Sequence, residues 1–131
     1  MAGIYMVMVE AYDIVVVDTS VLISAYELKK DPFEGLDVKN IYIPGSVIKE
    51  LERLGKTATK YTVAKRLIFK LLSLYNIIIG KDNGSFADKE ILNLVGKYKV
   101  FFTNDKILKQ EIKKRNGVVY SFSEKGLRKY N

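Results

Sequence analysis

The feature that most constrains the fold is a run of β-branched residues that ends abruptly at an acid. Residues 14–17 read Ile-Val-Val-Val, and Asp18 follows them directly. An unbroken apolar run of this kind is typical of a strand that is buried on both faces in the middle of a parallel sheet. Ligands bind beyond the carboxyl ends of such strands. Asp18 is therefore a candidate site residue, although an acid here can equally cap the following helix.

The rest of the sequence alternates between predicted helices and predicted strands. We expect helices over residues 20–28, 44–55, 61–75, 86–97 and 106–115, and further strands over residues 41–43, 76–79, 100–102 and 118–120. This alternation implies right-handed crossovers and a parallel sheet. The sequence thus predicts a single three-layer α/β domain over residues 1–131, with a central, mostly parallel five-stranded sheet and helices on both faces. Residues 1–12 are expected to form an extra strand or a dimer-forming extension, and residues 121–131 a polar, basic tail.

The composition excludes several kinds of chemistry. The chain has no cysteine and no histidine, so disulfides, thiolate catalysis, imidazole metal ligands and a Ser-His-Asp triad are all ruled out. The 22 Lys and Arg against 15 Asp and Glu give a net charge of +7, which suits a polyanionic partner, although solubility alone also explains it. The apolar start is short and soon meets Glu10, so we expect no membrane span and a cytoplasmic protein.

Three further acids are selected by their positions. Glu50 lies on the shoulder of the apolar stripe of its predicted helix, where it is either a site residue or an ordinary boundary glutamate. Asp88 occupies the first turn of the same helical face as Ile91 and Leu92, so its charge needs compensation, either from the helix amino terminus or from a metal. Asp105 follows a second buried strand and is also suited to cap a helix.

These acids favour a metal site if they converge. Neighbouring strands lie about 5 Å apart, so Asp18 and Asp105 would meet if their strands are adjacent. Clustered carboxylates need a counter-charge at neutral pH, and Mg²⁺ or Mn²⁺ with its preference for oxygen ligands supplies it. Activation of water by such an ion for attack on a phosphodiester requires no histidine. Composition and position together therefore allow metal-dependent phosphodiester hydrolysis.

Four segments in this order resemble the PIN-domain family of small metal-dependent ribonucleases. The segments are Val16 to Leu22, Ile43 to Leu51, Ala87 to Leu92 and Phe102 to Asp105. Each is common alone, but their combined order and spacing are fairly specific, and the similarity extends over residues 14–120.

The resemblance implies a fold, a cofactor and a site. The family's acidic quartet falls on Asp18, Glu50, Asp88 and Asp105, with its polar helper on Thr103. The implied activity is cleavage of RNA with Mg²⁺ or Mn²⁺ in an acidic pocket of a five-stranded sheet. Relatives include VapC-type toxins, which an antitoxin protein neutralises, and enzymes that process ribosomal RNA. Some relatives carry another acid shortly after the fourth, where this chain has lysine, isoleucine and leucine, which argues against a second firmly held metal.

Partners and rival functions are less constrained by the residues. Candidate RNA-binding residues are Asn104, Lys106, Lys109, Lys56 and Lys60, although lysines on helix faces are usually solvated surface. We also expect a homodimer or a higher oligomer. One rival function is a catalytically silent PIN scaffold that binds RNA or protein. The other is a receiver-type phosphoryl-transfer domain, which also places an acid after its first strand.

Overall fold

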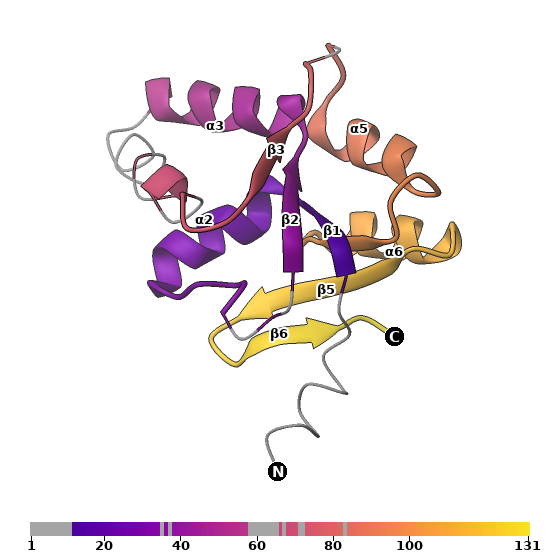
Figure 1. Cartoon of the computed structure of the whole chain (residues 1–131). Helices are drawn as coiled ribbons and strands as arrows, with labels where there is room; N and C mark the ends of the chain where they lie inside the picture. Colours follow the sequence, from indigo (N-terminus) through magenta and orange to yellow (C-terminus); the bar gives the residue numbers. More distant parts are fainter. Residues whose placement is uncertain are drawn as a thin grey trace.

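The computed structural model describes residues 12–34, 36, 38–57, 66, 68–70, 73–82 and 84–131. In this part of the chain, strands and helices alternate around one sheet of six strands (Figure 1). The strands are β1 (Tyr12–Val17), β2 (Val38–Ile43), β3 (Ile77–Ile79), β4 (Val100–Phe102), β5 (Val118–Ser123) and β6 (Gly126–Lys129). The helices are α2 (Thr19–Leu28), α3 (Gly45–Thr57), α5 (Ala87–Leu94) and α6 (Lys106–Lys114).

The order of the strands places β1 near the middle of the sheet. The order is β3-β2-β1-β4-β5-β6, and all pairs are parallel except β5 with β6. Along the chain, the strands first step from β1 outward to β3 and then return to the other side of β1 with β4. The direction of winding therefore reverses between β1 and β4, which makes the gap beyond their carboxyl ends the topological switch point of the sheet.

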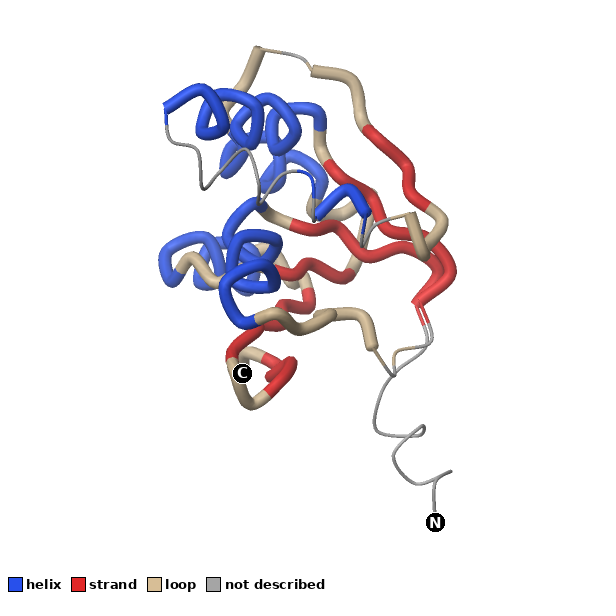
Figure 2. Tube along the Cα trace, turned by 90° about the vertical axis from the view of Figure 1, so that its left-hand side faces the viewer, coloured by secondary structure: helices blue, strands red, loops and turns tan. Residues whose placement is uncertain are grey.

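The β-branched run of β1 is buried as its sequence predicts. Val15 and Val17 are 0% exposed, because β2 and β4 flank the strand and helices cover it. Figure 1 shows α2 to one side of the sheet and α5 and α6 to the other. Figure 2 shows the same sheet and helices after a turn of 90° about the vertical axis. The predicted α/β class with helices on both faces is confirmed.

The sixth strand corrects the prediction of a five-stranded sheet with a polar tail. Residues 121–123 continue β5, and residues 126–129 turn back and pair with it in antiparallel register. Gly126 makes the turn possible because its φ of 92° is readily adopted only by glycine. Phe122 is 5% exposed and Leu127 packs against the core, so the hairpin is held by apolar burial despite its basic composition.

Other boundaries shift by a few residues. β2 begins at Val38, earlier than the predicted strand, and α5 ends at Leu94, earlier than the predicted helix. The predicted helix over residues 61–75 lies largely outside the described residues, although Arg66 and residues 68–70 are helical. The predicted N-terminal extension lies outside them as well, except that Tyr12 is the first residue of β1. None of the described helices has the length and apolar character needed to cross a membrane.

Candidate metal-binding site at the switch point

The site is organised by the register between β1 and β4. Val17 pairs with Phe102, and the backbone N–H of Asp18 donates to the carbonyl oxygen of Phe102 at 2.9 Å. This register places Asp18 opposite Thr103 at the carboxyl edge of the sheet, whereas Asp105 lies two residues further along. The strands that carry Asp18 and Asp105 are therefore neighbours, as the sequence-based hypothesis required.

The carboxylate of Asp18 is buried and held by two hydroxyl groups. Its Oδ2 accepts hydrogen bonds from Ser20 Oγ at 2.8 Å and from Thr103 Oγ1 at 2.8 Å, and only 8% of the residue is exposed. Asp18 is the N-cap residue of α2, and its side chain makes no regular capping hydrogen bond there, although the backbone N–H groups of Thr19 and Ser20 lower its pKa. Burial raises the pKa of Asp18, and the hydrogen bonds from Ser20 and Thr103 counteract this only in part.

Asp105 both begins α6 and faces the site. Its Oδ1 accepts from the backbone N–H of Leu108 at 2.9 Å, which is the predicted capping bond. Its own backbone N–H donates to Thr103 Oγ1 at 3.1 Å. The residue is exposed, and no described residue donates a hydrogen bond to its second carboxylate oxygen. Asp105 therefore combines a structural bond on one oxygen with an oxygen that is available to a ligand.

Asn104 holds the site to the end of β5. Its Oδ1 accepts from the backbone N–H of Phe122 at 2.7 Å, and its Nδ2 donates to the Phe122 carbonyl at 2.9 Å and to Ser24 Oγ at 2.9 Å. The backbone N–H of Asn104 also donates to Ser20 Oγ at 2.9 Å. The amide group thus positions β4, β5 and α2 relative to one another. Its predicted contact with substrate stays a prediction.

Glu50 reaches the site from α3. It is half-buried, while Glu52 and Arg53 are exposed, as the helical spacing predicts. Burial is the largest cause that raises the pKa of Glu50, and the negative charge of Asp18 is the next. The positive charge of Arg53 lowers this pKa, and the charge of Asp88 raises it by a smaller amount. The charges of Asp18, directly after β1, and of Asp88, in α5, therefore both act on Glu50.

Asp88 corrects the predicted orientation of α5. The buried face of α5 carries Ala87, Glu90 and Ile91, and Asp88 is exposed rather than directed at the core. Helical side chains lean toward the amino terminus, so an acid in the first turn reaches past the helix end. The helix begins after Phe86, so Asp88 is its second residue and lies at this end of the helix. There it lines the cavity at the switch point. The buried acid of this helix is Glu90 instead.

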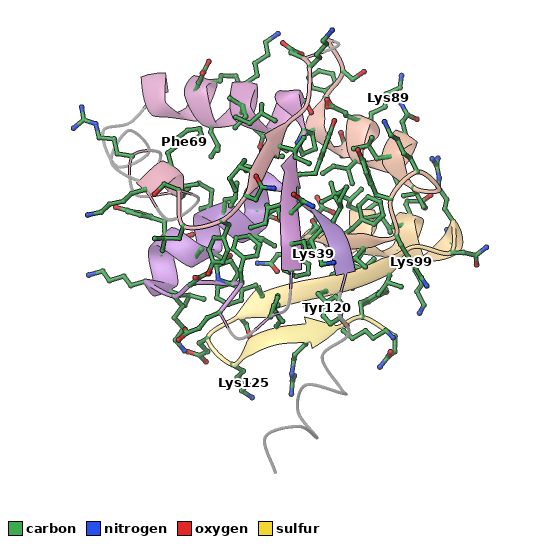
Figure 3. The ribbon with its side chains drawn as sticks, in the orientation of Figure 1. Lys39, Phe69, Lys89, Lys99, Tyr120 and Lys125 are labelled. Carbon is green, nitrogen blue, oxygen red and sulfur yellow. The ribbon has the colours of Figure 1, made fainter. Side chains whose placement is uncertain are left out.

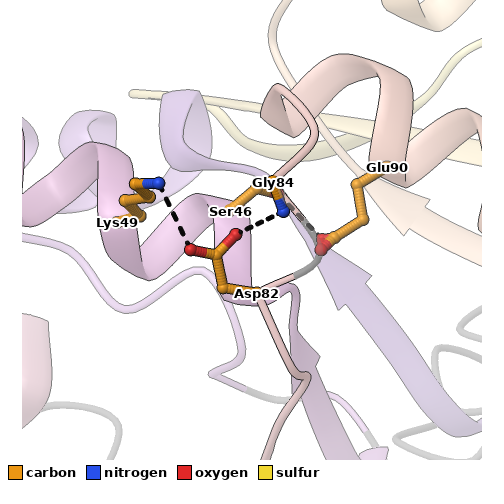
Figure 4. A network of polar contacts seen from close by, with 5 residues as sticks. All are labelled: Ser46, Lys49, Asp82, Gly84 and Glu90. Atoms are coloured by element: carbon orange, nitrogen blue, oxygen red, sulfur yellow. Dashed lines mark hydrogen bonds and ion pairs between the residues drawn. The ribbon is translucent and has the colours of Figure 1, made fainter.

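A polar network holds α3 against α5 (Figure 4). Ser46 Oγ donates to Glu90 Oε2 at 2.8 Å, which satisfies the buried carboxylate. Lys49 forms an ion pair with Asp82 at 3.4 Å, and the other oxygen of Asp82 accepts from the backbone N–H of Gly84 at 2.9 Å. Because Glu50 and Asp88 belong to these two helices, the network sets their relative positions.

The same junction depends on Gly45, the first residue of α3. A Cβ atom at this position would lie 2.4 Å from the backbone nitrogen of Asp82 and 2.6 Å from the carbonyl carbon of Lys81. Real Cβ atoms do not approach backbone that closely. The sequence therefore places its smallest residue where the backbone of the segment after β3 crosses the start of α3.

We predict that Gly45→Ala destabilises the protein by about 1–3 kcal/mol, because the added methyl group must push backbone apart. Thermal unfolding should show a midpoint that is lower by roughly 5–10 °C. Lys49→Ala is the matched control at the same junction, since an exposed ion pair contributes only about 0–1 kcal/mol. Equal unfolding midpoints for Gly45→Ala and the unchanged protein would show that the backbone at Lys81 and Asp82 can move aside without loss of stability.

The four acids line one cavity of about 690 Å³. Its walls come from the β1–α2 junction, α3 and the first turns of α5 and α6, and they include Asp18, Glu50, Asp88 and Asp105. Thr19 also lines the cavity, and its buried hydroxyl has no hydrogen-bond partner within the described residues. The predicted convergence of the quartet is thus present in the structure. Among the residues that the structure describes, however, no three acidic side chains are arranged to hold one metal ion.

Comparison with known proteins identifies the family. The sequence profile of the PIN-like domain family matches residues 15–125. The chain belongs to this family. In the PIN-like domain described here, all four acids of the expected quartet lie within the matched region.

Solved structures agree with this membership. The structure of the PIN domain endonuclease Utp24 has a TM-score of 0.67 and 26% sequence identity, over 88% of this chain and 90% of that one. A domain of a functionally unknown protein from Methanocaldococcus jannaschii has a TM-score of 0.64 and 20% identity, over 84% of this chain and 91% of that one, and shows the fold alone. No curated protein matches the chain.

The strand order also separates this PIN-like domain from the receiver alternative. Receiver domains have the flavodoxin-like strand order 2-1-3-4-5. Here the parallel part of the sheet has the order β3-β2-β1-β4-β5. The receiver hypothesis is therefore wrong for this chain, and the acid after β1 needs another explanation.

Sequence reasoning missed three polar residues that the structure places at the site. Ser20, Ser24 and Glu27 all line the cavity from α2. They are spaced at i, i+4 and i+7, so they share one face of the helix that begins directly after Asp18. This periodicity in polar residues was the available signal. The positions of acids after strands or within apolar stripes do not point to these residues.

The predicted basic contacts are only partly described. Lys106 is exposed at the start of α6, while the ammonium group of Lys109 lies 5.2 Å from the ring centre of Tyr130. The side chain of Lys56, and Lys60 as a whole, lie outside the described residues. In Figure 3 the labelled lysines lie on separate parts of the fold, from β2 through α5 to the β5–β6 turn. The RNA contacts expected for Lys106, Lys109, Lys56 and Lys60 stay a prediction.

Proposed function

We propose that this PIN-like domain is an endoribonuclease that hydrolyses RNA phosphodiester bonds with the help of Mg²⁺ or Mn²⁺. The observation that carries the proposal is the single cavity at the switch point that Asp18, Glu50, Asp88 and Asp105 all line. The similarity to a PIN domain endonuclease at 26% identity supports it.

The donor set suits a hard divalent cation, although no three of the described acids are placed to hold one ion together. Mg²⁺ is usually bound through only one or two carboxylates, with water and substrate phosphate oxygens as its other ligands. Asp18, Glu50, Asp88 and Asp105 would hold the ion from the walls of the cavity, some of them through water. When bound, the ion supplies positive charge for the phosphate and lowers the pKa of a bound water.

The residues around the acids have separate roles in this proposal. Ser20 and Thr103 fix the orientation of the Asp18 carboxylate through hydrogen bonds to Oδ2. Asn104 keeps β4 and β5 in register beside it. The half-buried Glu50, with its raised pKa, is suited to accept a proton from an attacking water.

The biological role of the cleavage is proposed to be either that of a VapC-type toxin or that of an RNA-processing enzyme. A neighbouring gene for a small DNA-binding protein would favour a toxin with an antitoxin partner, and its absence would favour processing. The alternative is a silent PIN scaffold that binds RNA or protein without cutting it. A cleavage assay separates this scaffold from both enzymes.

We predict that Asp105→Asn lowers the rate of RNA cleavage in Mg²⁺ or Mn²⁺ by about tenfold to 100-fold. Asparagine caps a helix as well as aspartate does, so stability should change by no more than about 0.5 kcal/mol. Labelled RNA would be incubated with protein and metal, with protein and chelator, and with the variant. Glu124→Gln, which removes an exposed charge outside the cavity, is the matched control. Equal cleavage in all samples would refute the proposal.

A further inference from the structure

Phe86 is an exposed aromatic residue on the rim of the acidic cavity. It is 83% exposed, the highest value among the large apolar side chains that the structure describes, and it lines the same cavity as Asp88 and Glu50. Its backbone is nevertheless fixed. The carbonyl oxygen of Phe86 accepts from the backbone N–H of Glu90 at 3.0 Å, and the next residue, Ala87, is buried.

The local structure gives no reason for an aromatic residue at this position. Phe86 is the N-cap of α5, where Ser, Thr, Asp or Asn would satisfy a free N–H group and where phenylalanine makes no side-chain bond. A hydrophobic staple would pair apolar side chains on the residue before the cap and on the fourth helical residue. In α5 these residues are Ser85 and Glu90, which are both polar. The ring therefore costs helix stability and buries little apolar surface.

We propose that Phe86 forms a stacking subsite for an unpaired nucleobase next to the cleavage position. This inference rests on the proposed function. The π-face of an aromatic ring binds any base, and base stacking on exposed aromatic side chains is the usual way in which single strands are held without sequence preference. A phosphate in a cavity of about 690 Å³ leaves its adjoining base at the rim, where Phe86 lies.

Fluorescence can test stacking independently of cleavage. The chain contains no tryptophan, so Phe86→Trp introduces a single reporter at the rim. Short single-stranded RNA in chelator should quench this fluorescence to saturation, because a stacked base quenches an indole. Leu74→Trp is the matched control, since Leu74 is 73% exposed. It precedes the amino end of β3, whereas the cavity lies beyond the carboxyl ends of the strands. An abasic oligonucleotide of the same charge should give little quenching.

A second variant separates binding from folding. Phe86→Ser supplies a good N-cap, so it should raise the unfolding midpoint by about 2–6 °C while it weakens single-stranded RNA binding by about tenfold. Phe86→Tyr should keep the affinity. The stacking proposal is overturned if Phe86→Trp is quenched equally by abasic and normal strands, or if Phe86→Ser binds RNA unchanged. Loss of stacking in a protein that still cleaves RNA would leave the proposed hydrolysis intact, whereas base-dependent quenching without any cleavage would refute hydrolysis alone.

Discussion

Asp18→Asn is expected to reduce metal-dependent RNA cleavage by about 100-fold or more and, in the absence of metal, to make the protein more stable. The loss of activity follows because charge stabilisation by a bound ion contributes several kcal/mol, and Asp18 is the most deeply buried acid of the site. The gain in stability follows because burial disfavours the charged form of Asp18. Asparagine removes that cost and can still accept from Ser20 and Thr103.

The two effects have opposite signs, which makes the experiment decisive. A merely structural carboxylate would lose stability and activity together, whereas a site residue is maintained at the expense of stability. We expect a gain of about 1 kcal/mol in the free energy of unfolding, measured by urea denaturation in chelator. Glu111→Gln is a suitable control, because Glu111 lies outside the cavity and only pairs with Lys114 on the surface. A less stable Asp18→Asn protein with normal cleavage would contradict both the site and its electrostatics.

Much of the fold was predictable because its strongest signals are local. The apolar runs of β1 and β4 are buried in place, and the acids after them mark the ends of those strands. The last hairpin was not predictable from composition, since Lys125 and Arg128 suggested a solvated tail. The hairpin depends on a long-range contact, because Phe122 is buried in the core. Gly126 allows the turn through its positive φ.

Which acids line the cavity could be predicted from the sequence, but the arrangement of their side chains could not. Helical periodicity correctly distinguished Glu50 from Glu52. Once the apolar face of α3 packs against the core, Glu50 is half-buried beside that face, and Glu52 points to solvent. Periodicity failed for α5, where Glu90 rather than Asp88 is buried. A helical wheel cannot anticipate the hydroxyl of Ser46, which comes from another helix and compensates the buried Glu90. Tertiary partners, which a sequence does not display, decide which acid can be buried.

Divalent metal is expected to stabilise the protein, and the effect should increase with pH. At a metal concentration 100 times the dissociation constant, binding to the folded state alone adds about 2.7 kcal/mol, or about 10 °C in the unfolding midpoint. The pKa values of Asp18 and Glu50 are raised above their ordinary values of 3.8 and 4.5. Without metal, these two groups therefore contribute stability that is fully present below their unfolded-state pKa values and is lost as pH rises through the folded-state values.

Metal reverses this trend because it binds only the ionised carboxylates. The difference between the unfolding midpoints in Mg²⁺ or Mn²⁺ and in chelator should be smaller at acidic pH than at mildly alkaline pH, as followed by differential scanning fluorimetry. The double variant Asp18→Asn with Glu50→Gln should abolish both the metal effect and most of the pH slope in chelator, while Glu124→Gln should keep both. A metal effect that persists in the double variant would place the ion elsewhere on the protein. No effect in the unchanged protein at millimolar metal would mean that the four acids share a cavity without binding an ion there, and the repulsion between them would then need another source of compensation.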